Sequence, residues 1–120
     1  SGASGATSAQ ERYQALVVED DTATLRTLRS ALTRAGIDCA HAPTGEMALE
    51  MFELREPHLV IIDLQLPQMT GEEVCKTIRG RSAVPIFALT DLHSDAEEVN
   101  LLRAGVDGYL MKPFNPMILA

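Results

Sequence analysis

Short apolar runs alternate along the chain with segments whose apolar residues recur at helical spacing. The short runs are continuously apolar rather than alternately apolar and polar, which is typical of strands buried on both faces of a parallel sheet. We therefore expect five strands: Tyr13–Val18, Ile37–Ala42, His58–Ile62, Val84–Leu89 and Gly108–Met111.

The segments between and after these runs predict helices. The first helix begins at Thr22 and ends at Gly36, because glycine readily terminates a helix. The fourth helix should turn Leu101 and Leu102 inward. The fifth, capped by Asn115, has room for little more than one turn. The second, third and fourth helices each follow a hydroxyl residue that can cap them: Thr44, Thr70 and Ser94.

This alternation of strands and helices predicts a doubly wound α/β fold. We expect a five-stranded parallel sheet with helices on both faces and a truncated last helix. The expected strand order is flavodoxin-like, 2-1-3-4-5, and ligands of such folds bind at the carboxyl ends of the strands.

Composition narrows the class of protein. A chain of 120 residues with 46% hydrophobic and 22% charged residues fits one globular domain. The small, polar residues 1–12 read as a flexible leader or a cloning remnant, and residues 13–120 as the domain. The net charge of −7, without a basic cluster, argues against direct binding to nucleic acid. We expect no membrane association, and Cys39 and Cys75 as reduced thiols favour a cytoplasmic location.

Polar residues follow four of the strands. Asp63 directly follows the apolar run Leu59–Ile62, and an ionised carboxylate is costly to bury unless it is paired or bound to a metal. Carboxylates suit Mg²⁺, lysine pairs with phosphate and a threonine hydroxyl can donate to a phosphoryl oxygen. The set therefore suggests metal-assisted phosphoryl chemistry on a carboxylate. Its members are Glu19, Asp20, Asp21, Asp63, Thr90 and Lys112.

Each of these residues also has an ordinary structural explanation. Asp20 or Asp21 could cap the first helix, and Thr90 could be a hydroxyl at a strand end. Lys112 could lie at the surface. Their joint occurrence at the ends of successive strands favours chemistry over coincidence.

Four motifs in this order resemble the receiver domains of two-component response regulators. They are VVEDD at Val17–Asp21, IIDLQLPQMTG at Ile61–Gly71, ALT at Ala88–Thr90 and AGVDGYLMKPF at Ala104–Phe114. The resemblance extends over Tyr13–Pro116.

The resemblance implies a phosphoacceptor and a metal site. Asp63 would be the nucleophile that takes a phosphoryl group from the phosphohistidine of a sensor histidine kinase or a phosphotransfer protein. Asp20, Asp63 and the backbone carbonyl of Gln65 would bind Mg²⁺, and Glu19, where the family more often has aspartate, would hold the ion through water.

The resemblance also implies a switch. Lys112 would pair with the phosphoryl group, Thr90 would hydrogen-bond to it, and Tyr109 would then turn inward. The face made by the fourth helix, the fifth strand and the fifth helix would change, which could favour a homodimer through this face. An output domain or effector outside this chain would respond. No catalytic turnover is expected beyond self-phosphorylation from a donor and slow autodephosphorylation.

Two other functions remain open at this point. One is a receiver-like module that binds protein partners without phosphorylation. The other is an aspartyl-phosphate hydrolase, which would need an acid where this chain has Gln65. Asp91 is a further departure, because the position after the threonine is usually small in the family. It could repel anionic phosphodonors or orient a hydrolytic water, or it could point to solvent or cap the fourth helix.

Overall fold

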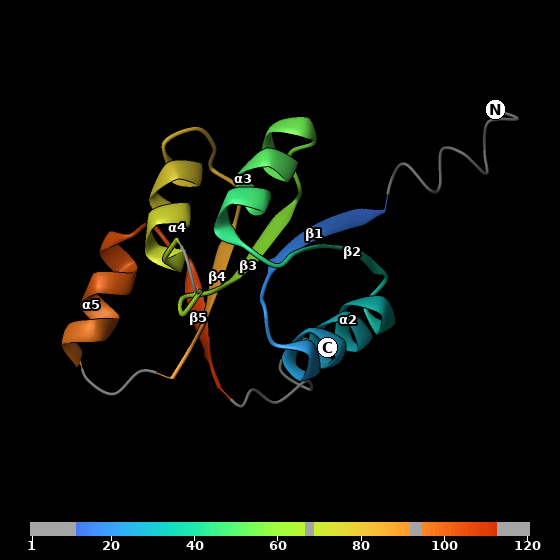
Figure 1. The fold of residues 1–120 in the computed structure, drawn as a ribbon, viewed down its shortest axis with the longest axis horizontal. Helices are drawn as coiled ribbons and strands as arrows, with labels where there is room; N and C mark the ends of the chain where they lie inside the picture. Colours follow the sequence, from blue (N-terminus) through green and yellow to red (C-terminus); the bar gives the residue numbers. More distant parts are fainter. Residues whose placement is uncertain (1–11, 67–68, 92–94, 113–120) are drawn as a thin grey trace, which may run out of the picture.

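The computed structural model describes residues 12–66, 69–91 and 95–112. Five strands form one parallel sheet in the order β2-β1-β3-β4-β5, which confirms the expected fold (Figure 1). Residues 1–11 of the leader, the Ser94 cap and the last helix with its Asn115 cap lie outside the described residues. The elements are β1 (Tyr13–Val18), α2 (Thr22–Arg34), β2 (Ile37–Ala42), α3 (Gly45–Leu54), β3 (Leu59–Asp63), α4 (Gly71–Arg79), β4 (Ile86–Thr90), α5 (Asp95–Arg103) and β5 (Gly108–Met111).

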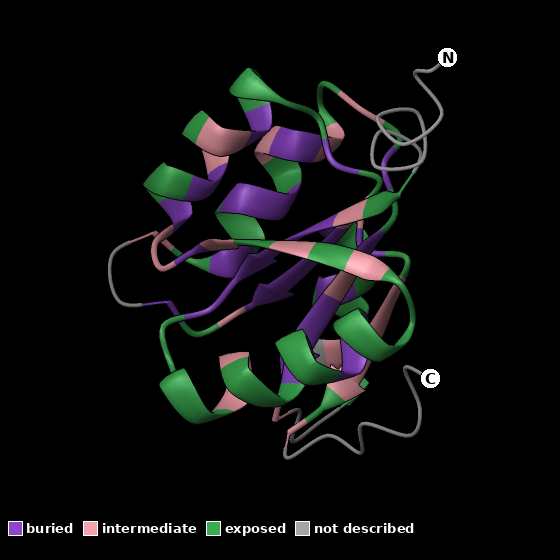
Figure 2. Cartoon of the chain, turned by 90° about the vertical axis from the view of Figure 1, so that its right-hand side faces the viewer, coloured by how far each residue is buried: buried purple, intermediate pink, exposed green. Residues whose placement is uncertain are grey.

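Helices cover both faces of the sheet. Helices α3, α4 and α5 lie on one face and α2 on the other (Figure 1). Successive side chains of a strand point to opposite faces. Leu16 and Val18 of β1 accordingly join the core under α3 and α4, whereas Ala15 and Val17 pack against α2. Figure 2 shows the buried strands between these layers. No helix in the described part of the chain is long and apolar enough to cross a membrane.

Some element boundaries and one core position differ from the sequence prediction. Strand β3 runs through Asp63 and β4 runs through Thr90, because the backbone ladder continues where the side chains become polar. Strand β4 starts at Ile86 rather than at Val84. The inward assignment of Leu102 is wrong, since it is 54% exposed while Leu101 is buried. Neighbouring helical residues are about 100° apart, so both cannot face the core fully.

The predicted helix ends of the described segments follow local chemistry. Thr44 and Thr70 cap α3 and α4, and each side chain accepts a hydrogen bond from the backbone N–H three residues on. Asp21 caps α2 in the same way, so this acid is engaged in structure rather than in the site. Gly36 adopts a φ of +79°, which glycine tolerates without strain.

Arg79, at the end of α4, joins several segments at the amino ends of the strands. Its guanidinium donates to the side chain of Asp107 at 2.8 Å, and the same Asp107 oxygen accepts the backbone N–H of Ile86 at 2.8 Å. One side chain therefore holds α4, the start of β4 and the turn before β5 together. The backbone carbonyls that also accept from Arg79 belong to Ser82, Val84 and Gly105.

Gly71 allows α4 to begin directly against the end of β3. A Cβ atom at this position would lie 2.5 Å from the carbonyl oxygen of Asp63 and 2.6 Å from the Cα of Leu64. The Gly71 N–H also donates to the Leu64 carbonyl at 3.3 Å. Backbone atoms cannot yield as a flexible side chain would, so the loop that carries Asp63 depends on this close approach.

We expect Gly71→Ala to lower the free energy of unfolding by about 2 kcal/mol or more, because it forces backbone apart. Gly80→Ala is the matched control, since a Cβ there meets only ordinary contacts at 3.5 Å and φ is −66°. Urea denaturation followed by circular dichroism measures both variants. Equal stability of the two variants would contradict the assigned role of Gly71.

Candidate functional site

Four strand ends meet at the carboxyl edge of the sheet. Asp63 in β3 is opposite Leu89 in β4, and the Lys112 N–H donates to the Thr90 carbonyl at 2.8 Å. These backbone pairings place the ends of β3, β4 and β5 side by side in that order. The residues at the four ends are Glu19 after β1, Asp63 in β3, Thr90 in β4 and Lys112 after β5.

Three acids lie together at this edge. One carboxylate oxygen from each of Glu19, Asp20 and Asp63 falls within 4.8 Å of the others. Glu19 is 0% and Asp63 3% exposed, whereas Asp20 is exposed. Two buried carboxyl groups this close cannot both carry full charge without a neighbouring cation.

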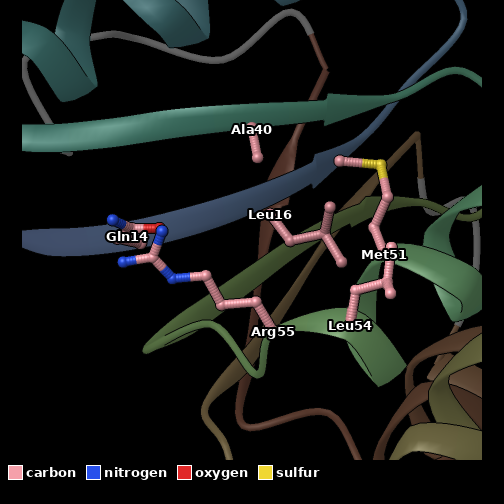
Figure 3. A pocket seen from close by; sticks show the side chains of 6 residues that line it. All are labelled: Gln14, Leu16, Ala40, Met51, Leu54 and Arg55. Carbon is pink, nitrogen blue, oxygen red and sulfur yellow. The ribbon is translucent and has the colours of Figure 1, made fainter.

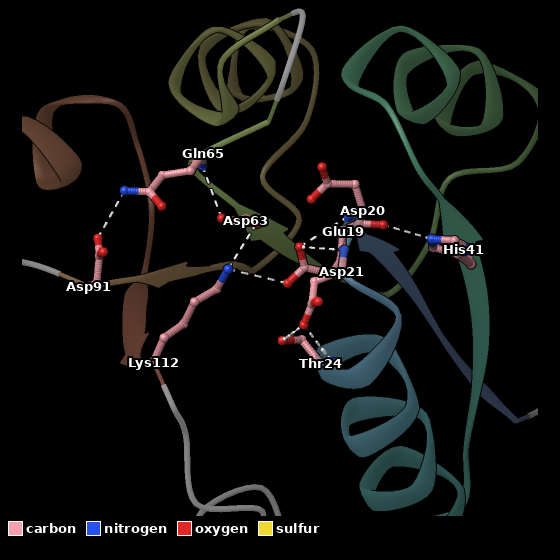
Figure 4. Close-up of polar contacts among 9 residues, drawn as sticks. All are labelled: Glu19, Asp20, Asp21, Thr24, His41, Asp63, Gln65, Asp91 and Lys112. Atoms are coloured by element: carbon pink, nitrogen blue, oxygen red, sulfur yellow. Dashed lines mark hydrogen bonds and ion pairs between the residues drawn. The ribbon is translucent and has the colours of Figure 1, made fainter.

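Lys112 supplies a positive charge to the two buried acids (Figure 4). Its Nζ lies 2.9 Å from Asp63 Oδ2 and 3.5 Å from Glu19 Oε1. Burial alone would lower the pKa of Lys112, but the contacts with Asp63 and then Glu19 raise it. The lysine is therefore a permanent cation in this site.

Glu19 and Asp63 respond to the same surroundings in opposite directions. Burial, followed by the neighbouring Asp63 carboxylate, raises the pKa of Glu19 to about 7. Burial acts in the same sense on Asp63, but Glu19, the Gln65 N–H and Lys112 together lower its pKa. Asp63 is thus the ionised member of the pair near neutral pH, and Glu19 is the member that retains a proton as the pH falls below about 7.

Backbone contacts fix Glu19 in place. Its N–H donates to the Ala42 carbonyl at 3.1 Å, and its own carbonyl lies 2.8 Å from His41 Nε2. Glu19 Oε2 accepts the N–H of Asp20 at 3.0 Å and of Asp21 at 3.4 Å. Sequence analysis missed His41, because only the register of β1 with β2 brings it to this turn.

The donor set fits a hard divalent cation. Such ions take carboxylate and carbonyl oxygens, and they are commonly held by a few acids with water completing the shell. Glu19 Oε1 is buried and, apart from its ion pair with Lys112 at 3.5 Å, has no hydrogen-bond partner among the described residues. A proton or a cation would satisfy this oxygen, and the oxygens of Asp20 and Asp63 lie close enough to share an ion with it.

The two residues expected to act as a switch lie on neighbouring strands. Thr90 ends β4 and is 6% exposed. Tyr109 lies in β5 opposite Ala88, half-buried against the core. Partial burial and then the Glu98 carboxylate of α5 raise the pKa of the Tyr109 hydroxyl. Tyr109 therefore lies near Glu98 of α5, and β4 separates its strand from the β3 strand that carries Asp63.

Gln65 links the nucleophile position to Asp91. Its N–H donates to Asp63 Oδ1 at 2.9 Å, and its side-chain amide donates to Asp91 Oδ1 at 3.0 Å (Figure 4). Asp91 is half-buried. Because it accepts this hydrogen bond, the Asp91 carboxylate belongs to the surroundings of the site.

A hollow lies between β1, β2 and α3, away from the acid cluster (Figure 3). Its volume is about 250 Å³. It contains no carboxyl group, so it does not share the chemistry of the acid cluster. Its lining residues are Gln14, Leu16, Ala40, Met51, Leu54 and Arg55.

Comparison with known proteins identifies the family. Residues 15–120 match the model of the response regulator receiver domain. The chain therefore belongs to the receiver domains of response regulators, which confirms the resemblance read from its motifs.

The most informative relatives are longer proteins. The probable transcriptional regulator ycf27 of Porphyridium aerugineum is 37% identical over 106 residues, which are 88% of this chain and 44% of that protein. The DNA-binding response regulator MtrA of Mycolicibacterium paratuberculosis is 40% identical over 105 residues, or 88% of this chain and 47% of that protein. The chain thus spans less than half the length of these curated relatives.

Solved structures show the same fold. A putative response regulator from Chloroflexus aurantiacus superposes with a TM-score of 0.85 at 31% identity, covering 91% of this chain and 92% of that chain. The chemotaxis response regulator CheY4 of Vibrio cholerae gives a TM-score of 0.84 at 31% identity, with 90% and 92% covered.

The raised pKa of Glu19 predicts a pH dependence of stability in the metal-free protein. An acid whose pKa rises on folding, here from 4.5 to about 7, binds more protons in the folded state across that interval. The free energy of unfolding should therefore fall as pH rises from about 4.5 to 7, by the order of 1–3 kcal/mol. The lowered pKa of Asp63 acts only below its ordinary value of 3.8, outside this window.

Urea denaturation in EDTA at several pH values measures this slope. Glu19→Gln cannot titrate, so it should flatten the profile across the same interval. An equally steep profile in wild type and Glu19→Gln would contradict the assignment of the proton to Glu19.

Proposed function

We propose that the chain is a phosphoacceptor receiver in which Asp63 takes a phosphoryl group from the phosphohistidine of a sensor histidine kinase or phosphotransfer protein. One observation carries this proposal: Asp63 is a nearly fully buried, ionised carboxylate with Lys112 Nζ at 2.9 Å. A nucleophile needs its free electron pair, and the lowered pKa keeps Asp63 deprotonated near neutral pH.

Mg²⁺ is the cofactor that suits this site. Asp20, Asp63 and the Gln65 carbonyl would hold it, with Glu19 as the buried acid beside it. A bound magnesium ion neutralises charge on the transferring phosphoryl oxygens. Because Glu19 retains a proton below about pH 7 without the metal, binding of the ion at such pH should release that proton into solution.

The transfer consumes only the donor. An oxygen of Asp63 forms a bond to phosphorus, the bond from phosphorus to the histidine nitrogen breaks, and its electron pair remains on the imidazole. Lys112 then pairs with the phosphoryl group, and Thr90 donates a hydrogen bond to it. Later attack of water on phosphorus returns Asp63 as a carboxylate and releases phosphate. We expect this autodephosphorylation to be slow, without catalytic turnover of the donor.

The signal follows from the added charge. A phosphoryl group brings nearly two negative charges and three acceptor oxygens. It would draw the Thr90 hydroxyl toward Asp63, and Tyr109 would then shift from its place beside Glu98 into the space left behind. The surface of α5, β5 and the segment that follows would change, and it could serve a homodimer.

The output belongs to a longer protein. The relatives are described as DNA-binding or transcriptional regulators, and this chain spans less than half of their length. We therefore propose a cytoplasmic regulator whose receiver controls an output segment outside these residues. The second candidate, a receiver-like module that signals by contacts alone, needs neither the ionised Asp63 nor its lysine.

Incubation with Mg²⁺ and acetyl phosphate should add one phosphoryl group per chain, measured by intact mass. Asp63→Asn should abolish the gain, because the amide is not a nucleophile. Asp38→Asn is the matched control, because Asp38 is an exposed acid of β2 that pairs with Arg12. This variant should leave the gain in mass unchanged.

The outcomes separate the candidate functions. No gain in wild type at any donor concentration would reject the phosphoacceptor in favour of the contact-only module. A gain that persists in Asp63→Asn would place the phosphoryl group elsewhere. Continuous release of phosphate at many equivalents per minute would indicate a hydrolase instead.

A further inference from the structure

The hollow between β1, β2 and α3 has an apolar floor and apolar walls. Leu16 of β1 lies at its base and is 2% exposed, while Met51 and Leu54, about one turn apart on α3, line one wall (Figure 3). The other wall includes Ala40 of the edge strand β2, whose small side chain leaves the space open. Leu54 is 86% exposed, so the last turn of α3 presents an apolar side chain that the described residues leave largely uncovered.

The hollow is polar at one end only. Figure 3 shows the side-chain nitrogen atoms of Gln14 and Arg55 together at that end, away from the sulfur atom of Met51. Within the described part of the chain, no carboxylate forms an ion pair with Arg55. Asp38, which lies opposite Gln14 in the ladder, is paired with Arg12 at 2.9 Å. The Arg55 guanidinium therefore offers its donors to an anion at the edge of an apolar surface.

The volume of the hollow limits the size of an occupant. An apolar cavity of about 150 Å³ can hold one benzene ring, so a hollow of about 250 Å³ has room for a ring with a short chain. Pockets for drug-sized molecules are larger, from about 300 Å³ upward. The thioether chain of Met51 is flexible and can adapt its wall to the shape of such a ligand. The hollow thus suits a small molecule rather than a folded partner.

We propose that this hollow binds a small organic acid, with its apolar body between α3 and Ala40 and its carboxylate on Arg55. Burial of the apolar body supplies the affinity, because the hydrophobic effect grows with the apolar area removed from water. Arg55 supplies the selectivity, since a planar guanidinium matches the two oxygens of a carboxylate. The Gln14 amide can donate a further hydrogen bond. None of these residues belongs to the acid cluster, so the inference is independent of the phosphorylation proposed for Asp63.

Two probes of similar shape separate burial from charge. Phenylbutyrate has a terminal phenyl ring, a short chain and an ionised carboxylate, and phenylbutanol replaces the carboxylate with an uncharged hydroxyl. Titration of each probe into isotope-labelled protein at neutral pH, followed by two-dimensional amide NMR spectra, measures both affinity and location. We expect phenylbutyrate to bind with a dissociation constant of about 1 mM or lower and to shift the amide signals of Gln14, Ala40 and Met51.

The order of the two affinities is the decisive result. A surface without a cation would prefer the alcohol, because an ionised carboxylate is more costly to desolvate. With Arg55 at the end of the hollow, phenylbutanol should bind about threefold more weakly than phenylbutyrate. The difference should disappear in about 1 M salt, where the screening length is about 3 Å.

Three variants locate the interaction. Arg55→Gln removes the charge but keeps a polar side chain, so it should weaken phenylbutyrate about fivefold and leave phenylbutanol unchanged. Arg29→Gln is the matched control, because Arg29 is an exposed arginine of α2 on the opposite face of the sheet, and it should change neither affinity. Ala40→Leu fills the hollow from an exposed position of an edge strand, so it should weaken both probes about tenfold while the amide spectrum stays that of a folded protein.

Several outcomes would overturn the proposal. Equal or tighter binding of phenylbutanol would remove the assigned role of Arg55. Equal weakening of phenylbutyrate in Arg55→Gln and Arg29→Gln would indicate long-range attraction rather than a site. Unchanged binding to folded Ala40→Leu would place the probes outside this hollow, and no binding of phenylbutyrate at about 10 mM would reject the site itself. The titrations contain no phosphodonor, so their result does not depend on the function proposed for Asp63.

Discussion

Two carboxyl groups and one ammonium group share a buried space at the end of the sheet, and this imbalance governs the site. Glu19 and Asp63 are nearly inaccessible to water, and Lys112 can compensate only one of them. The protein resolves the imbalance by leaving a proton on Glu19 and the charge on Asp63. The proton removes the uncompensated negative charge when no ion is bound. A cation that replaces this proton would balance the charge equally well.

The scaffold around this imbalance is mostly backbone. Glu19 is held through its own N–H and carbonyl, by Ala42 and His41 of the edge strand β2. On the opposite side of Asp63, the glycine at the start of α4 lets a helix approach where any side chain would collide. The acids are thus positioned by groups that carry no reactive chemistry, which is why their geometry depends on strand register and on one missing Cβ atom.

Much of the fold and the members of the candidate site could be predicted from the sequence, because both depend on pattern. Continuous apolar runs predicted the parallel sheet, and polar residues at strand ends predicted which side chains gather at its edge. Distances, protonation and cross-strand contacts could not be predicted. The contact of His41 with Glu19 depends on register, and the contact of Gln65 with Asp91 joins residues from two different loops. Leu102 was misplaced because periodicity gives the direction of a helix face but not its width.

Arg79 holds the amino ends of β4 and β5 more firmly than their carboxyl ends are held. At the amino ends of the strands, one guanidinium bonds three backbone carbonyls and the carboxylate that also receives the N–H of Ile86. The carboxyl ends have no comparable clamp on β4 and β5 among the described residues; there the polar groups surround the site itself. A rearrangement that begins at the site would therefore act on strands anchored at the far end. The strand ends and α5 would pivot about the Arg79 anchor, so a small displacement beside Asp63 would become a tilt of the outer surface rather than a shift of the whole layer.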